Sequence, residues 1–281
     1  MVVITARALS EGIKKKYPKG VAIVSRPGGG GSLALAELVQ TKPDGYTIIL
    51  APLSTMVIHP QINDLPYKTP DDYEPIINVV AFSSLLVVKP DSPWKTIQEF
   101  IGAARANPGK FRVGSPGEGT QSHLNLEELK RQAGIDVTHV PFSGWGESSP
   151  ALLGGHIEAL VAQPGEVKPL VDGNKMRVLM VFQAQRHPAF PGAPSTKDMG
   201  WNPLSGVFFT FVAPKGTPGP AQKYIHDAVK GAMDDPQFVN TIKQRVIEID
   251  YRSGDALRAD IWKEYKIQAE LLTRLGMIKK K

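Results

Sequence analysis

Segments with the residue pattern of β-strands alternate with segments patterned as α-helices along almost the whole chain. Short apolar runs indicate buried strands, and apolar residues at helical spacing fill most of the intervals between them. The expected strands are residues 21–24, 47–51, 111–113, 137–142, 157–162, 176–182, 207–213 and 247–250. The expected helices are residues 1–16, 31–40, 96–107, 120–133, 148–153 and 253–275, with two more that begin at Pro218 and Pro236. This order predicts parallel strands joined by crossover helices, the α/β class.

The length of the chain and two proline-containing segments predict two lobes. A chain of 281 residues is longer than most single domains. Residues 89–93 and 201–206 contain proline and separate patterned segments, so we expect the chain to cross between the lobes there. Lobe one would comprise residues 1–90 plus 207–281, and lobe two residues 91–206. Open α/β sheets bind ligands at the carboxyl ends of their strands, which would here face a cleft.

Composition excludes several classes of protein. No apolar run has the length needed to cross a bilayer. The net charge of +6 favours anionic partners, but Lys and Arg are scattered, so we expect no nucleic-acid partner. The absence of cysteine excludes disulfides, thiolate metal sites and cysteine nucleophiles. The histidines are widely separated, so we expect no metal site, and for His123 a surface position or a capping role is favoured over ligation.

Residues 113–134 hold the first candidate binding site. A strand-like run ends at a loop that contains Gly117 and Gly119, and a helical pattern begins at Thr120. Glycines let a ligand approach the backbone, and the free N–H groups of a helix N-terminus attract anions. The hydroxyls of Thr120 and Ser122 could add hydrogen bonds. The same residues also fit a tight turn in which Thr120 only caps its own helix, and the pattern alone leaves both interpretations open.

A second glycine-rich segment precedes the expected helix at residues 31–40. Its four consecutive glycines are as typical of a flexible connection as of a ligand-binding loop, and Ser32 is the expected helix cap. Ser54 and Thr55 follow the expected strand 47–51. Their hydroxyls would lie at the carboxyl end of that strand, which suits the opposite wall of a cleft.

The sequence lacks the residue arrangements that catalysis needs. No Gly-Lys-Thr phosphate loop is present, and Pro116 interrupts the only turn that resembles a nucleophile elbow. Glu127 and Glu128 are adjacent and point to different helix faces, so they make a poor acid–base pair. We therefore expect no catalytic residue and no cofactor. An α/β enzyme with an anion-binding cleft is the alternative from a different class.

Five longer stretches, taken together, resemble a known family. They are RPGGGGSLALAELVQTKPDGYTIIL, VGSPGEGTQSHLNLEEL, HVPFSGWGESSPALLGGHIEALV, KMRVLMVFQAQRHPAFPGAPSTKDMG and FVAPKGTP. In this order, and over nearly the whole chain, they are similar to the solute receptors of tripartite tricarboxylate transporters, the Bug family of periplasmic binding proteins. The resemblance implies a two-lobed Venus-flytrap fold in which each lobe is a mixed sheet flanked by helices. It also implies capture of a small carboxylate and delivery to the permease subunits of a membrane transporter.

The resemblance implies that both lobes contact the ligand. Lobe two would hold the carboxylate in a glycine-rich turn, through backbone N–H groups and ordered water. Lobe one would contribute a strand end, and Gln163 occupies a position that is often Asp or Asn, which could alter selectivity. The residues that match ligand-contacting positions are Ser54, Thr55, Gly117, Gly119, Thr120, Gln121, Ser122, Phe142 and Gln163.

The resemblance further implies a monomer in the periplasm whose signal peptide has been removed. No catalytic residue, cofactor or metal is implied, and a ligand-sensing receptor for a signalling partner is an alternative. In the family, a strand and a glycine-rich loop precede the helix that residues 1–16 match. We therefore expect this chain to lack that strand of lobe one and part of the ligand cage.

Overall fold

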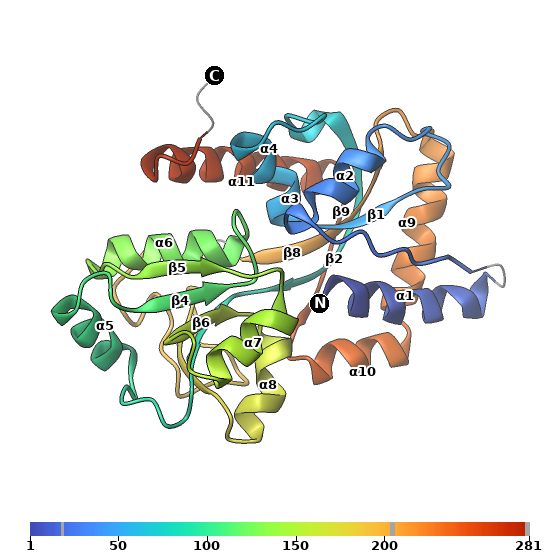
Figure 1. Cartoon of the computed structure of the whole chain (residues 1–281). Helices are drawn as coiled ribbons and strands as arrows, with labels where there is room; N and C mark the ends of the chain where they lie inside the picture. The colour runs from blue at the N-terminus through green and yellow to red at the C-terminus, as the bar shows by residue number, and fades with distance from the viewer. Residues whose placement is uncertain (18–19, 203–205, 279–281) are drawn as a thin grey trace. The chain divides into compact units, whose positions relative to one another are not determined.

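The structure is a computed structural model, and it describes residues 1–17, 20–202 and 206–278. The chain divides into two compact units (Figure 1). Unit 1 comprises Met1–Ala81 and Phe208–Lys281, and unit 2 comprises Phe82–Val207. The first crossing lies earlier in the chain than the predicted boundary between residues 90 and 91. The reason is that β3 (Leu85–Val88) pairs with two strands of unit 2.

Unit 1 is built on a four-stranded sheet with the order β1-β8-β2-β9. These strands are β1 (Ile49–Pro52), β8 (Val207–Pro214), β2 (Tyr73–Phe82) and β9 (Glu248–Ser253). β1 runs antiparallel to β8, and β2 runs antiparallel to β9. Inside the sheet, Thr210 Oγ1 donates to Asn78 Oδ1 at 3.0 Å, and Asn78 Nδ2 donates to Asp250 Oδ2 at 2.9 Å. This chain of bonds satisfies buried polar groups across three neighbouring strands.

Helices surround the sheet of unit 1. The first helix, α1, packs against α9 and α10 so closely that a Cβ at Gly12 would lie 3.0 Å from Ala232 Cβ. The last helix, α11, packs against α3. The helices are α1 (Val2–Lys16), α2 (Ser32–Leu38), α3 (Leu53–Val57), α4 (His59–Ile62), α9 (Gly219–Met233), α10 (Pro236–Gln244) and α11 (Gly254–Arg274), with 3₁₀ turns at Gly29–Gly31 and Pro70–Asp72.

Three predictions for unit 1 are wrong. The predicted parallel pairing does not hold for β1 with β8 or for β2 with β9, which are antiparallel. Residues 21–24 form no strand, and the side chains of Val21 and Val24 are 45% and 65% exposed. An apolar β-branched run favours a strand only where a neighbouring strand pairs with it, and none of the described residues does so. Ser32 is the first residue of α2 and not its cap; Gly31 precedes it in the left-handed region with φ 98°.

Unit 2 is built on a five-stranded mixed sheet with the order β5-β4-β6-β3-β7. β4 (Arg112–Ser115) runs parallel to both β5 (Thr138–Pro141) and β6 (Ala159–Ala162). β3 runs antiparallel to β6 and to β7 (Arg177–Val181). The register Leu85↔Ala162 and Leu85↔Val181 therefore places the start of β3 at the edge where the other four strands end.

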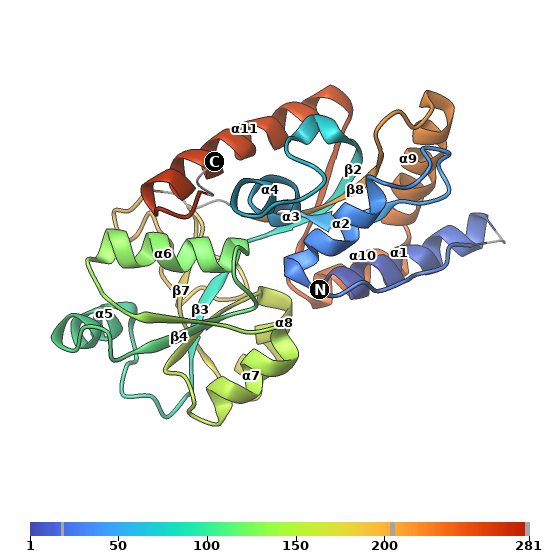
Figure 2. The ribbon, with the colours of Figure 1, turned by 45° about the horizontal axis from the view of Figure 1, so that its top comes forward.

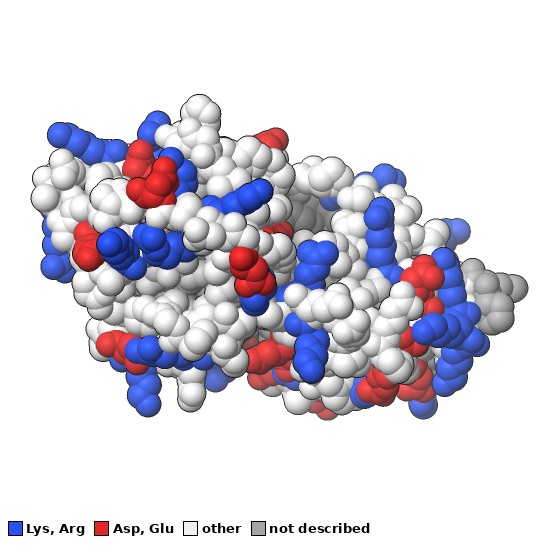
Figure 3. All heavy atoms as spheres, turned by 90° about the horizontal axis from the view of Figure 1, so that it is seen from below, with Lys and Arg blue, Asp and Glu red and all other residues white. Residues whose placement is uncertain are grey.

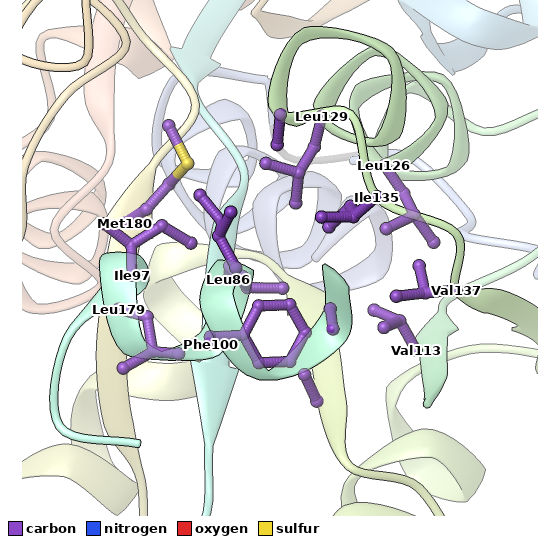
Figure 4. Packing of buried hydrophobic residues seen from close by; sticks show 14 of the residues in the cluster. Leu86, Ile97, Phe100, Val113, Leu126, Leu129, Ile135, Val137, Leu179 and Met180 are labelled. Carbon is purple, nitrogen blue, oxygen red and sulfur yellow. The ribbon is translucent and has the colours of Figure 1, made fainter. Parts of the chain in front are cut away.

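The hydrophobic core of unit 2 lies between this sheet and two helices, α5 (Ile97–Ala106) and α6 (Gln121–Ala133) (Figure 4). Phe100 is fully buried there, with Trp94 edge-on to it at 5.4 Å between ring centroids. α7 (Trp145–Leu153) contacts β4 and β6 from the other face, and α8 (Pro164–Asp172) follows β6. Figure 2 shows α6 on one side of the unit 2 sheet and α7 on the other.

Charges are mixed on the surface. Figure 3 shows Lys and Arg interspersed with Asp and Glu over the face that it presents, so no single basic stripe of the kind that follows a nucleic-acid backbone is seen there. Among the described residues, no helix has the length and apolar character needed to span a bilayer.

Candidate functional site

The carboxyl edge of the unit 2 sheet gathers loops from every strand. β4, β5, β6 and β7 end at this edge, and β3 begins at it. The chain segments that meet there are therefore those that follow Ser115, Pro141 and Ala162, together with the residues just before Leu85. Of the residues predicted to bind ligand, Gly117–Ser122, Phe142 and Gln163 all lie at this edge. Such an edge is where open α/β sheets bind ligands.

The loop after β4, residues 115–120, is held by its own polar groups; we call it the glycine loop. Gly117 and Gly119 have φ of 152° and 66°, which residues with a Cβ rarely adopt. Ser115 Oγ donates to the carbonyl of Gly117 at 3.0 Å, and Thr120 Oγ1 donates to the same oxygen at 2.7 Å. Phe142 supports the loop from β5, because its N–H donates to the carbonyl of Ser115 at 3.0 Å.

Thr120 is the N-cap of α6, as one of the two interpretations predicted. Its Oγ1 accepts a hydrogen bond from the N–H of His123 at 3.3 Å. The first backbone N–H groups of an α-helix have no acceptor inside the helix. The helix dipole adds partial positive charge at the same point. The start of α6 is therefore able to bind an anion, whereas the hydroxyl hydrogen of Thr120 is already donated to Gly117.

Two serines that were not predicted lie just before β3. Ser84, just before β3, is buried, and its Oγ lies 3.2 Å from Ser122 Oγ. Ser83 is also buried, and its Oγ has no hydrogen-bond partner among the described residues. Gln163 Oε1, at the end of β6, is likewise buried and unpartnered within the described part of the chain. Unpartnered buried polar atoms are rare in proteins, so these two atoms at one sheet edge suit a polar ligand.

A pair of histidines lies behind the glycine loop. The rings of His123, from α6, and His139, from β5, stack with centroids 3.8 Å apart and an interplanar angle of 11°. Burial lowers the pKa of both imidazoles to about 4, so both are neutral at pH 7. The prediction that His123 would lie at the surface or act as a cap is wrong. The side chain is buried, and its Nδ1 accepts from the N–H of Gly119 at 3.1 Å.

Ser54 and Thr55 belong to unit 1, where both are buried in α3, directly after β1. Thr55 Oγ1 donates to the carbonyl of Gly30 at 3.0 Å, so it fastens the glycine-rich segment before α2 to α3. That segment is packed tightly, because a Cβ at Gly30 would lie 2.5 Å from His59 Nε2. Contact of Ser54 and Thr55 with a ligand stays a prediction.

No local pattern in the sequence points to Ser83, Ser84 or His139. Ser84 meets Ser122 only because β3 begins at the edge where β4 ends. His139 meets His123 only because β5 pairs with β4, in the register Val113↔His139. Once the strand pairing is known, the alternation of side chains along each strand shows which residues face the same side of the sheet.

The chemistry of this edge is that of anion binding by neutral donors. Its groups are glycine backbone, the first turn of a helix, hydroxyls and an amide. Among the described residues, no group of three or more His, Cys, Asp and Glu side chains could hold a metal ion. Hydrogen bonds from neutral donors to a charged acceptor are stronger than those between neutral groups, so several of them suffice to hold a carboxylate.

Comparison with known proteins identifies the family of this chain. Residues 5–277 match the profile of a family described as "Tripartite tricarboxylate transporter family receptor". A protein of Cupriavidus necator, described as "UPF0065 protein in gbd 5'region", is 36% identical over 282 residues, which is 98% of this chain and 84% of that protein.

Two solved structures share the fold. "Structure of periplasmic binding protein BugD" has a TM-score of 0.91 and 25% identity, and covers 99% of this chain and 94% of its own. "Structure of a periplasmic transporter" has a TM-score of 0.91 and 26% identity, with 99% and 93% covered. The fold is thus the two-lobed α/β fold of periplasmic binding proteins. The chain therefore belongs to the receptor family of the tripartite tricarboxylate transporters, whose members bind solutes and are not enzymes.

Proposed function

We propose that this protein captures a small organic carboxylate at the carboxyl edge of the unit 2 sheet and delivers it to a tripartite tricarboxylate-type transporter. The observation that carries the proposal is the glycine loop that leads into the first turn of α6. There, backbone N–H groups and a helix dipole converge beside buried hydroxyls. The family description, which names a tricarboxylate transporter receptor, supports a carboxylate as the anion.

The first turn of α6 would bind the carboxylate oxygens. Backbone N–H groups at the start of α6 would donate to them, and Ser122 Oγ would do so after release from Ser84. Thr120 would act mainly by holding the loop, because its hydroxyl already bonds Gly117. Ser83 Oγ and Gln163 Oε1 would bind further polar groups of the ligand and so select among acids.

We further propose that the protein acts in the periplasm as a monomer, with the permease subunits of the transporter as its partners. A di- or tricarboxylate, an acidic amino acid or an aromatic acid would be the cargo. The solved structures described as a periplasmic transporter and as the periplasmic binding protein BugD support the compartment. The absence of cysteine suits an oxidising compartment as well.

A thermal-shift panel tests the proposal. The chain is melted with citrate, malate, adipate, glutamate and benzoate, each paired with its neutral amide at equal ionic strength. At a hundred times its Kd, a bound acid stabilises the folded state by about 2.7 kcal/mol, which raises the Tm by several degrees. We expect at least one acid, and none of the amides, to produce such a shift.

Ser122→Ala is the site variant, and Ser148→Ala, a buried serine of α7 in the same unit, is its matched control. Losing one bond to a charged ligand group costs about 1.5–3 kcal/mol, so Ser122→Ala should weaken the affinity at least tenfold in calorimetric titration. Ser148→Ala should leave the affinity unchanged. A panel in which no acid raises the Tm above its amide, or an equal loss in both variants, would contradict the proposed site.

A further inference from the structure

The stacked histidines contact the glycine loop at both of its ends. His123 Nδ1 accepts from the N–H of Gly119 at 3.1 Å, so the ring proton of neutral His123 sits on Nε2. His139 Nε2 lies 2.7 Å from Ser115 Oγ, whose own hydrogen is donated to Gly117. His123 thus has one defined tautomer, and each ring contacts one end of the loop.

We propose that His123 and His139 are positioning residues for the ligand carboxylate. While both rings are neutral they hold the glycine loop in its binding conformation, and protonation of His123 releases it. This inference rests on the proposed function, because it concerns how the same loop is kept ready for its ligand. Neither histidine itself touches the ligand in this arrangement.

Protonation of His123 conflicts with the contact that its ring makes with the glycine loop. A proton on His123 Nδ1 would face the N–H of Gly119, which places two donors against each other and leaves that N–H without its acceptor. Two charged rings stacked with centroids 3.8 Å apart would also repel. The glycine loop therefore cannot keep its hydrogen bond to His123 while that ring is protonated.

The neighbouring charges do not offset this conflict. Glu127 Oε1 lies 3.9 Å from His123 Nε2, but it also lies 2.9 Å from Lys130 Nζ, so its charge is already paired. Burial is the largest cause of the lowered pKa of both histidines; Lys130 lowers both further, and Glu127 raises that of His139. A released, solvated ring has a pKa near 6.5. The released loop thus binds more protons between pH 6.5 and about 4, and acid favours it.

Four variants separate the hydrogen bonds that the histidines make to the glycine loop from the packing of their rings. His123→Asn keeps an acceptor near the Nδ1 position, and His139→Gln keeps a donor near the Nε2 position, while neither titrates in this range. His123→Leu keeps bulk but removes the acceptor. His156→Asn removes an exposed histidine of the same unit and serves as the control.

Binding of malate and adipate is titrated by calorimetry from pH 7.5 to pH 4.5. We expect the affinity of the parent and of His156→Asn to fall with pH at least tenfold more than that of the double variant His123→Asn/His139→Gln. Comparing variants at each pH cancels the protonation of the acids themselves. At pH 7.5, His123→Leu should bind about tenfold more weakly than the parent, as for one lost hydrogen bond, and His123→Asn should restore most of that loss.

Equal pH profiles in the parent and the double variant, together with parent-like binding by His123→Leu, would overturn the inference. If the parent binds neither acid at pH 7.5, the failure belongs to the proposed function. The Gly119 amide resonance of the ligand-free chain then tests whether His123 holds the glycine loop. It should move with acid in the parent and stay fixed in His123→Asn. A resonance that is unmoved in both would overturn the inference as well.

Discussion

The hydroxyl of Thr120 caps α6, and its hydrogen is donated to the carbonyl of Gly117. Thr120 was predicted either to cap its helix or to contact a ligand as well, and the predicted cap is confirmed. The cap is visible in the sequence because it depends only on residues within the next turn. The stacking of His123 on His139 was not predicted, because it depends on how β5 pairs with β4.

Thr120→Ala should lower the free energy of unfolding by about 1 kcal/mol, the usual value of an N-cap hydroxyl. Thr120→Ser keeps the hydroxyl and should recover most of that loss. Urea unfolding of the parent and both variants measures the differences. If Thr120→Ala unfolds at the same urea concentration as the parent, the cap bond contributes nothing and the account of the loop is wrong.

The helices were predicted more reliably than the strands. α5 begins at a capping box, in which Thr96 Oγ1 accepts from the N–H of Glu99 and the Glu99 carboxylate accepts from the N–H of Thr96. That signal lies within four residues, so the sequence alone reveals it. A strand is stabilised by a partner that is distant in sequence. The apolar residues 21–24 therefore predicted a strand that does not form, and the partners of β2 and β4 were not assigned.

Substitutions at two glycines of unit 2 test how these elements pack, and they should change the free energy of unfolding in opposite directions. A Cβ at Gly114, in β4, would lie 2.7 Å from Ile157 Cδ1 and 3.0 Å from Leu160 Cδ1, so Gly114→Ala should destabilise the protein by about 1–3 kcal/mol. Gly102, exposed in the middle of α5, has no neighbour within 4 Å of such a Cβ. Gly102→Ala should therefore stabilise the protein by about 0.5–1 kcal/mol through helix propensity. Chemical denaturation measures both, and two changes of the same sign would contradict the packing described.

At the scale of the whole molecule, the two units share a sensitivity to acid. His59 in unit 1 is buried, as His123 is in unit 2, and burial lowers the pKa of His59 to about 4. His59 Nδ1 lies 3.2 Å from Asn63 Nδ2, which donates to it when the ring is neutral. Each unit therefore contains imidazole that has to stay uncharged while the unit is folded.

The free energy of unfolding should fall as the pH falls from 6.5 towards 4. In that interval the unfolded chain binds protons that the folded chain does not, so acid favours unfolding. For a single histidine whose pKa is lowered from 6.5 to about 4, the full loss is on the order of 3 kcal/mol. Urea unfolding at pH 7, 5.5 and 4.5 measures it. A stability that stays constant over this interval would show that these imidazoles are solvated.

The division of the chain also decides what intrinsic fluorescence can report. Trp94, Trp145 and Trp201 lie in unit 2, and Trp262 is the tryptophan of unit 1. Emission from the intact protein is therefore weighted towards unit 2, where Trp94 packs on Phe100 and Phe111. Trp262→Phe would leave emission from unit 2 alone, and a chain that keeps only Trp262 would report on unit 1. Comparing these two spectra during unfolding gives each half of a single chain its own optical signal without any added label.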